Sequence, residues 1–120
     1  MGLPEYVHFG YGGSFQRTVT EDGSAADLSS ATEIAIEFYD DPGDPIVSFN
    51  TTDDAANFDN TLASGIVRFV WDADTFTSVA DDLVAAGKFR ARHNARIVIT
   101  TEAHTDGYVV PVPFVVEFRR

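Results

Sequence analysis

The stretch KFRARHNARIVITT, residues 88–101, decides the fold. Side chains of successive residues in a β-strand point to opposite faces, so a period of two separates a core face from an outer face. Here the core face would carry Phe89, Ile97 and Ile99, each worth roughly 1.5–3 kcal/mol when buried. The outer face would carry four cations: Lys88, Arg90, Arg92 and Arg96. The pattern therefore predicts one long, half-buried strand with a basic outer face.

The same alternation recurs along the chain. It is found in five further segments: residues 14–20, 31–40, 46–52, 65–71 and 108–118. Two Asp-Gly pairs, at residues 22–23 and 106–107, predict turns, and the prolines and glycine of residues 40–45 predict a loop. Six or seven short strands separated by turns predict an all-β protein, an antiparallel β-sandwich of about seven strands.

A single short helix is predicted over residues 74–86, directly before the basic strand. Its apolar residues recur at helical spacing and form one stripe: Phe76, Val79, Ala80, Leu83 and Val84. Such a stripe faces the core. Asp74 is the expected N-cap, and Gly87 occupies the position after the helix where a left-handed residue is favoured.

Residues 1–13 are expected to form an N-terminal arm ahead of a single domain of residues 14–120. Proline and several glycines oppose regular structure in this segment. Its aromatic residues Tyr6, Phe9 and Tyr11 would anchor the arm to its own domain or to a neighbouring protein.

The last predicted strand, residues 108–118, is expected to pair with the basic strand through the turn at residues 104–107, and it contains two prolines. Pro111 and Pro113 lack N–H donors on the same side of the strand, so that side cannot carry a regular ladder of hydrogen bonds. The strand is therefore expected to lie at a sheet margin or to change partners midway.

The charge is distributed unevenly. The net charge is −11, with two basic and sixteen acidic side chains in residues 1–87 and six basic and three acidic ones in residues 88–120. The acidic body would repel phosphate, so nucleic-acid binding is not expected. An acidic body with one basic strip suits contacts between protein subunits. The alternatives are that acidity only maintains solubility, or that it reflects saline surroundings.

The basic strip needs compensation, because like charges on one strand face repel one another. Glu33 and Glu37 are the candidates within the domain, and an acidic surface of a neighbouring subunit is the candidate outside it. A simply solvated outer face is the remaining interpretation.

No pattern of residues points to catalysis. The chain has no cysteine, no Gly-x-Ser-x-Gly motif and no His pair at metal-ligand spacing, so neither an enzyme nor a metal or cofactor is expected. Residues 1–5 have no signal-peptide character and no stretch reaches the length of a membrane span. We therefore expect synthesis in a cytoplasm and no membrane partner.

His93 is the polar exception on the core face of the basic strand. We expect a bulge or strand crossing at residues 93–94 that turns it outward. A buried, hydrogen-bonded neutral imidazole is the first alternative and a pH switch the second.

The order of these signals resembles a known family. The segments that carry the likeness are GSFQRTVTEDG (13–23), DLSSATEIAIEF (27–38), GIVRFVW (65–71), GKFRAR (87–92) and DGYVV (106–110). Over residues 13–118 they resemble the immunoglobulin-like N-terminal domain of phage baseplate upper proteins and related tail and head accessory modules. The resemblance implies an immunoglobulin-like β-sandwich with a structural role in a virion and no catalysis.

The function expected from this resemblance is assembly of a tailed-phage virion, in its tail or baseplate, head–tail junction or capsid decoration. Other virion proteins and copies of the chain itself would be the partners, because virion proteins are repeated by symmetry. The expected interface residues are Tyr6, Phe9, Tyr11, Arg90, Arg92, Arg96, Arg119 and Arg120. The alternative is a module that binds a host-surface glycan or protein through the loops at residues 40–45 and 52–64.

The substitution Ile97→Asp tests the assignment of the basic strand. It would place a charge in the predicted core, so the variant should fail to fold. Circular dichroism during urea unfolding checks this expectation, and a soluble variant with native cooperativity would overturn the strand assignment.

Overall fold

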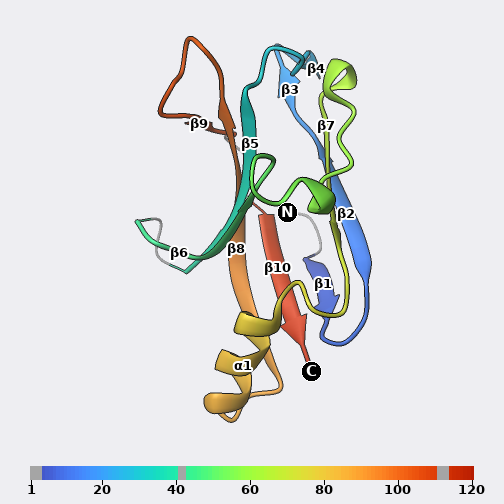
Figure 1. Ribbon diagram of the computed structural model, residues 1–120, viewed down its shortest axis with the longest axis vertical. Helices are drawn as coiled ribbons and strands as arrows, with labels where there is room; N and C mark the ends of the chain where they lie inside the picture. The colour runs from blue at the N-terminus through green and yellow to red at the C-terminus, as the bar shows by residue number, and fades with distance from the viewer. Residues whose placement is uncertain (1–3, 41–42, 111–113) are drawn as a thin grey trace.

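The protein is built from two β layers, with one helix at the end of the molecule where the chain terminates (Figure 1). The computed structural model describes residues 4–40, 43–110 and 114–120. Strands predominate and the sheets form a sandwich-like arrangement, which confirms the predicted all-β class.

The first layer is the main sheet. Its strands, in spatial order, are β1 (Glu5–His8), β10 (Phe114–Arg119), β8 (Arg90–Thr100), β5 (Glu33–Tyr39) and β6 (Pro45–Asn50), with β9 (Tyr108–Val109) also paired to β8. Each pair is antiparallel except for β1 and β10, which run parallel. The predicted antiparallel sheet therefore has one parallel edge.

The second layer and the connections are smaller. They comprise the antiparallel pair β2 (Gly13–Thr18) and β7 (Ile66–Trp71), the hairpin of β3 (Thr20–Glu21) and β4 (Ser24–Ala25), the 3₁₀ turns η1 (Ala55–Asn57) and η2 (Leu62–Ser64), and the helix α1 (Thr77–Ala85).

The described part of the predicted N-terminal arm belongs to the main sheet. Strand β1 pairs with β10, and Val7 in its centre is buried. The N–H of Phe9 donates to the carbonyl of Arg119 at 2.9 Å, and the ring of Phe9 stacks on Phe118. The N-terminal segment is therefore attached to its own domain, which is the first of the two possibilities predicted from the sequence.

Strand β8 is the predicted long strand, and it occupies the centre of the main sheet. It pairs with β5 on one side and with β10 on the other. Ala95, Ile97 and Ile99 are buried against the second layer, which confirms the core face over this half of the strand. The prediction for Phe89 is wrong, because this residue precedes the strand and 78% of its surface is exposed.

The core between the layers consists largely of aromatic rings. Phe38 of β5 is fully buried, and its ring centroid lies 5.5 Å from that of Phe76, 5.7 Å from that of Phe118 and 6.3 Å from that of Phe69. These contacts are edge-to-face, the arrangement that the charge distribution of aromatic rings favours. Phe38 thus joins the main sheet to β7 and to the beginning of α1.

Arg17 of β2 also connects the two layers. Its Nη1 donates to Oε2 of Glu5 in β1 at 2.6 Å, and its guanidinium carbon lies 4.3 Å from the centroid of the Phe114 ring in β10. Both partners belong to the main sheet, so this half-buried cation fastens the second layer to the sheet edge.

Helix α1 ends in the motif predicted from Gly87. This glycine has a φ of 69°, its N–H donates to the carbonyl of Val84, and the N–H of Lys88 donates to the carbonyl of Leu83. The two bonds form a Schellman C-cap. The predicted N-cap at Asp74 is wrong, since Phe76 occupies the N-cap position and the cap has no side-chain hydrogen bond.

The described parts of the C-terminal strand are β9 and β10, both paired with β8 as expected. Pro111 and Pro113 lie outside the described residues, but β10 lies between β1 and β8, so the expected position at a sheet margin is wrong for this part of the strand. Within β10, Val116 and Phe118 face the core, and Glu117 points to the outer face between them.

Replacing Phe38 by alanine tests the role of the aromatic core. Loss of its contacts with both layers and the resulting cavity should lower the free energy of unfolding by about 3–5 kcal/mol. Urea unfolding followed by circular dichroism measures the change. Phe58→Ala is the matched control, because Phe58 is only partly buried and touches the same Phe69 ring; an equal loss in both variants would contradict the central role of Phe38.

Candidate protein interface

The outer face of the main sheet carries a charged cluster centred on Glu117. In the strand register, Glu117 of β10 lies between Tyr6 of β1 and Arg92 of β8. Its carboxylate accepts a hydrogen bond from Nε of Arg92 at 2.7 Å and another from Nε of Arg119. The guanidinium of Arg119 also lies over the Tyr6 ring, 4.3 Å from its centroid. Only 1% of Glu117 is exposed, so arginine side chains replace water around its charge.

The two arginines lower the pKa of Glu117. The hydrogen bond from Arg92 makes the largest contribution and the one from Arg119 the second, whereas the loss of water acts in the opposite direction and is smaller. The carboxylate lies on the outer face of the sheet, covered only by neighbouring side chains. The effect of its charged hydrogen-bond donors on the pKa therefore exceeds the effect of its removal from water. Glu117 therefore remains ionised near neutral pH.

Arg96 has separate partners on β5. Its Nε donates to Oε1 of Glu37 at 2.6 Å, and its guanidinium lies 4.5 Å from the centroid of the Tyr39 ring. Glu37 is one of the two acids expected to compensate the basic face. The other, Glu33, accepts a hydrogen bond from the hydroxyl of Thr52.

The ion pairs with Glu117 and Glu37 reduce the part of the predicted basic strip whose charge is uncompensated. The side chain of Arg96 is only 15% exposed, and that of Arg92 is 64% exposed but directs its Nε to Glu117. Charge on this part of the sheet is mainly compensated from within. The uncompensated part of the strip is restricted to the beginning of β8.

The remaining cations lie together where β8 begins and β10 ends. Arg90 of β8 is directly opposite Arg119 of β10. We name this region the cationic corner, and its residues are Lys88, Phe89, Arg90, Arg119 and Arg120. It holds four of the eight basic residues of the chain. Among the described residues, only Glu117 forms an ion pair with any of the four.

Phe89 has the largest exposed fraction of the described large apolar side chains. The backbone N–H of Arg120 donates to the carbonyl of Phe89 at 2.9 Å, and the guanidinium of Arg120 lies 5.4 Å from the centroid of the Phe89 ring. Nη1 of Arg120 donates to the carbonyl of Lys88 at 3.2 Å. An aromatic ring beside arginines is a typical composition of the central part of a protein interface.

The N-terminal aromatic residues expected at an interface have three different environments. Tyr6 is 41% exposed and belongs to the Glu117 cluster. Phe9 packs on Phe118, so its ring contributes to the core and not to an exposed anchor. Tyr11 is 73% exposed and lies in the turn between β1 and β2.

His93 lies in a regular part of β8. The pairing of β8 with β10 continues through His93 and Asn94 without a shift, so the predicted bulge is wrong. Nδ1 of His93 lies 2.6 Å from Oδ1 of Asp40, and its ring is near that of Phe118. The side chain is 15% exposed, so the observed arrangement is the alternative of a largely buried, hydrogen-bonded imidazole.

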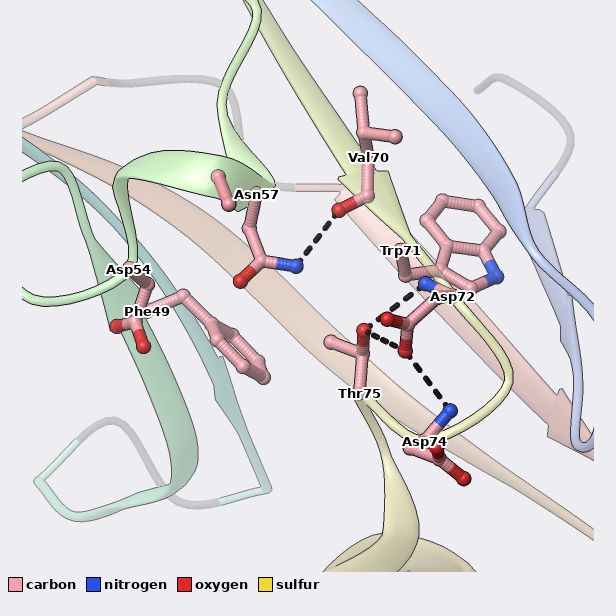
Figure 2. A pocket seen from close by; sticks show the side chains of 9 residues that line it. Phe49, Asp54, Asn57, Val70, Trp71, Asp72, Asp74 and Thr75 are labelled. Carbon is pink, nitrogen blue, oxygen red and sulfur yellow. Dashed lines mark hydrogen bonds between the residues drawn. The ribbon is translucent and has the colours of Figure 1, made fainter.

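An acidic hollow lies between η1 and the loop that joins β7 to α1 (Figure 2). Its volume is about 430 Å³, and its lining residues include Phe49, Asp54, Trp71, Asp72, Asp74 and Thr75. Figure 2 shows the ring of Phe49 on one side and the Asp72–Thr75 loop on the other. The N–H of Asp74 and then the hydroxyl of Thr75 donate to Asp72, and these bonds lower its pKa. Asp72 is therefore a stable negative charge at the rim.

The loops expected to bind a glycan offer little aromatic surface. Phe58 packs edge-on against Phe69, with 5.6 Å between the ring centroids, and Phe49 at the preceding strand is buried. Within the described residues, no three His, Asp or Glu side chains are grouped so that they could hold a metal ion. The same part of the chain contains no helix that is long and apolar enough to cross a membrane.

Comparison with known proteins provides no relative. No protein-family model, curated protein or solved structure matches the chain. The likeness to phage baseplate and accessory domains therefore remains a prediction from the sequence.

Two residues of this region are missed by the sequence prediction. Glu117 is missed because only the strand register places it opposite Arg92; a single acid on the outer face of the strand expected to pair with the basic strand was the available signal. The exposure of Phe89 is missed because alternation assigns it to the core, although its position two residues after Gly87 signals a turn.

Glu117→Gln tests the charged cluster through its pH dependence. Folding lowers the pKa of Glu117 below its unfolded-state value of about 4.3. The ionised carboxylate therefore stabilises the folded protein fully above that value. This stabilisation is lost as the pH falls through the lowered pKa of the folded state. The variant should be less stable than wild type at pH 7, and the difference should shrink at pH 3. Urea unfolding at both values measures it.

Glu102→Gln is the control for this experiment, because it removes one carboxylate from an exposed turn. A Glu117→Gln variant that differs from wild type by the same free energy at pH 7 and pH 3 would show that the ion pairs do not contribute as described.

Proposed function

We propose that the chain is a non-enzymatic structural or accessory subunit of a tailed-phage virion that acts by protein–protein assembly. The immunoglobulin-like identity of its sandwich is part of this proposal. Its support is the order of sequence motifs over residues 13–118 together with an all-β sandwich that presents one chemically distinct corner. Other virion proteins and copies of the chain are the proposed partners.

The exposure of Phe89 within the cationic corner carries this proposal. A phenylalanine that is 78% exposed forgoes the free energy of burial, roughly 1.5–3 kcal/mol. Its only ring contact within the described residues is with Arg120. A partner that covers this ring would recover the free energy of burial, while the surrounding cations would select an acidic surface.

The charge of the whole chain supports a protein partner. Most acidic side chains lie before residue 88. The corner lies at one end of the main sheet, and its residues all belong to the last third of the chain. Attraction between opposite charges accelerates association of the corner with an acidic surface. Repulsion disfavours association of the corner with another basic surface. The corner therefore defines both the position and the polarity of the proposed contact.

Incorporation into particles tests the proposed function. Purified phage particles that encode the chain should contain it in a fixed stoichiometry, measurable by quantitative mass spectrometry. When a deletion of its gene is complemented, Phe89→Ser should lower incorporation at least about tenfold, because truncation of a central aromatic anchor typically costs that much affinity. Absence of the wild-type chain from particles would refute the virion role.

Tyr108→Ser is the matched control for this experiment. It also removes an exposed ring, but from the opposite end of the main sheet (Figure 1). The thermal midpoint of each purified variant shows whether the fold is intact. Equal incorporation of the two variants would show that the corner is not the assembly contact.

A further inference from the structure

We infer that the cationic corner of one copy docks on the acidic hollow of a second copy of the same chain, in a head-to-tail contact. This inference rests on the proposed assembly function and specifies the partner of the same corner. It combines three features: an exposed aromatic anchor, cations around it, and a hollow with carboxylates on an acidic surface.

The charges exclude a symmetric contact of corner with corner. Such a contact would bring Lys88, Arg90 and their copies together without intervening acids, and like charges at an interface cost several kcal/mol. The rest of the chain is strongly acidic, because four of its eight cations lie in the corner. A second copy therefore offers a favourable surface only away from its own corner.

The acidic hollow complements the corner in charge. Asp54, Asp72 and Asp74 provide negative charge around a cavity of about 430 Å³, within the range of about 300–1,000 Å³ found for binding pockets. Phe49 and Trp71 are largely buried and form the floor of the hollow, so only the small exposed parts of their rings could contact Phe89. The carboxylate of Asp74 has no hydrogen-bond or ion-pair partner among the described residues, although its backbone groups do.

The two surfaces lie at opposite ends of α1. The loop that contributes Asp72 and Asp74 precedes the helix, and the corner begins directly after its C-cap at Gly87. Nine helical residues extend about 14 Å, so one copy cannot close the contact on itself without unfolding the helix. Different patches meeting in this way form a heterologous contact, which produces a closed ring or an open filament.

Nucleic acid is the less suitable occupant of the corner. Its binding requires many phosphate contacts, and the acidic body around the corner would repel the adjoining phosphates. A short anionic chain would also leave the Phe89 ring uncovered unless it carried an aromatic group. The second copy supplies both the charges and the aromatic lining.

Sedimentation velocity over a range of protein concentrations tests the inference with the full chain. The wild-type protein should associate reversibly, and raising the salt concentration should weaken association, because exposed charges are screened. Phe89→Ser and Arg90→Glu should each raise the dissociation constant at least about tenfold, and Asp74→Lys should do the same from the other side. The double variant Arg90→Glu with Asp74→Arg should recover association.

Glu102→Lys is the matched control, because it makes the same charge change as Asp74→Lys at an exposed position just after the C-terminal end of β8, the end of the strand opposite to Arg90. Its association should equal that of wild type. Loss of association in the control, or no rescue in the double variant, would overturn the acidic hollow as the acceptor.

Three further outcomes separate this inference from the proposed function. A wild-type chain that stays monomeric at millimolar concentration, while Phe89→Ser still lowers incorporation into particles, would overturn the second copy and leave the assembly role intact. A monomer whose corner binds a heparin fragment, with loss of binding in Arg90→Glu, would overturn it in favour of an anionic polymer. Equal incorporation of Phe89→Ser and Tyr108→Ser would instead refute the assembly role of the corner.

Discussion

Strand β8 is hydrogen-bonded on both sides, and this constraint determines how the rest of the chain is arranged. With β5 on one side and β10 on the other, its inward side chains have no route to solvent and form the floor of the core. Its outward arginines are fixed at defined positions on a flat face, where repulsion among them must be compensated locally. Glu37 and Glu117 provide that compensation because the same pairing places each directly opposite an arginine.

The same constraint explains why charge remains at only one end of the strand. The pairing of β8 with β5 ends at the Tyr39–Asn94 pair, so residues 90–93 continue past the last residue of β5. Beside them β10 contributes Arg119, a like charge, opposite Arg90. No carboxylate of β5 is available at that level, and the corner stays positive. The positive charge at this end of β8 thus stays uncompensated for two reasons: β5 ends before it, and β10 places an arginine beside it.

Local patterns in the sequence predict those parts of the structure that local patterns control. Alternation correctly identifies the buried Ile97 and Ile99, and helical spacing with Gly87 correctly identifies the helix and its C-cap. Alternation fails at Phe89, because the C-cap turn and not the strand determines the direction of that residue. The pairing of β1 with β10 and of Glu117 with Arg92 joins segments far apart in the chain. The register of these pairs is set only when the sheet assembles, so it cannot be predicted from the pattern of any one segment.

If the proposed contact forms, folding and binding depend on different parts of the segment that contains β8. In the second half of β8, core side chains and the compensated Arg96 act together, and a change on either face removes contacts on which the sheet depends. Just before the strand, Phe89 is held by one backbone hydrogen bond from Arg120, while its ring contributes almost nothing to the packed core. A side chain that stabilises the isolated molecule so little can be selected for a partner without cost to the fold. An acidic protein with one such corner carries an intrinsic polarity, and repeated use of this polarity favours directional assembly over a symmetric pair.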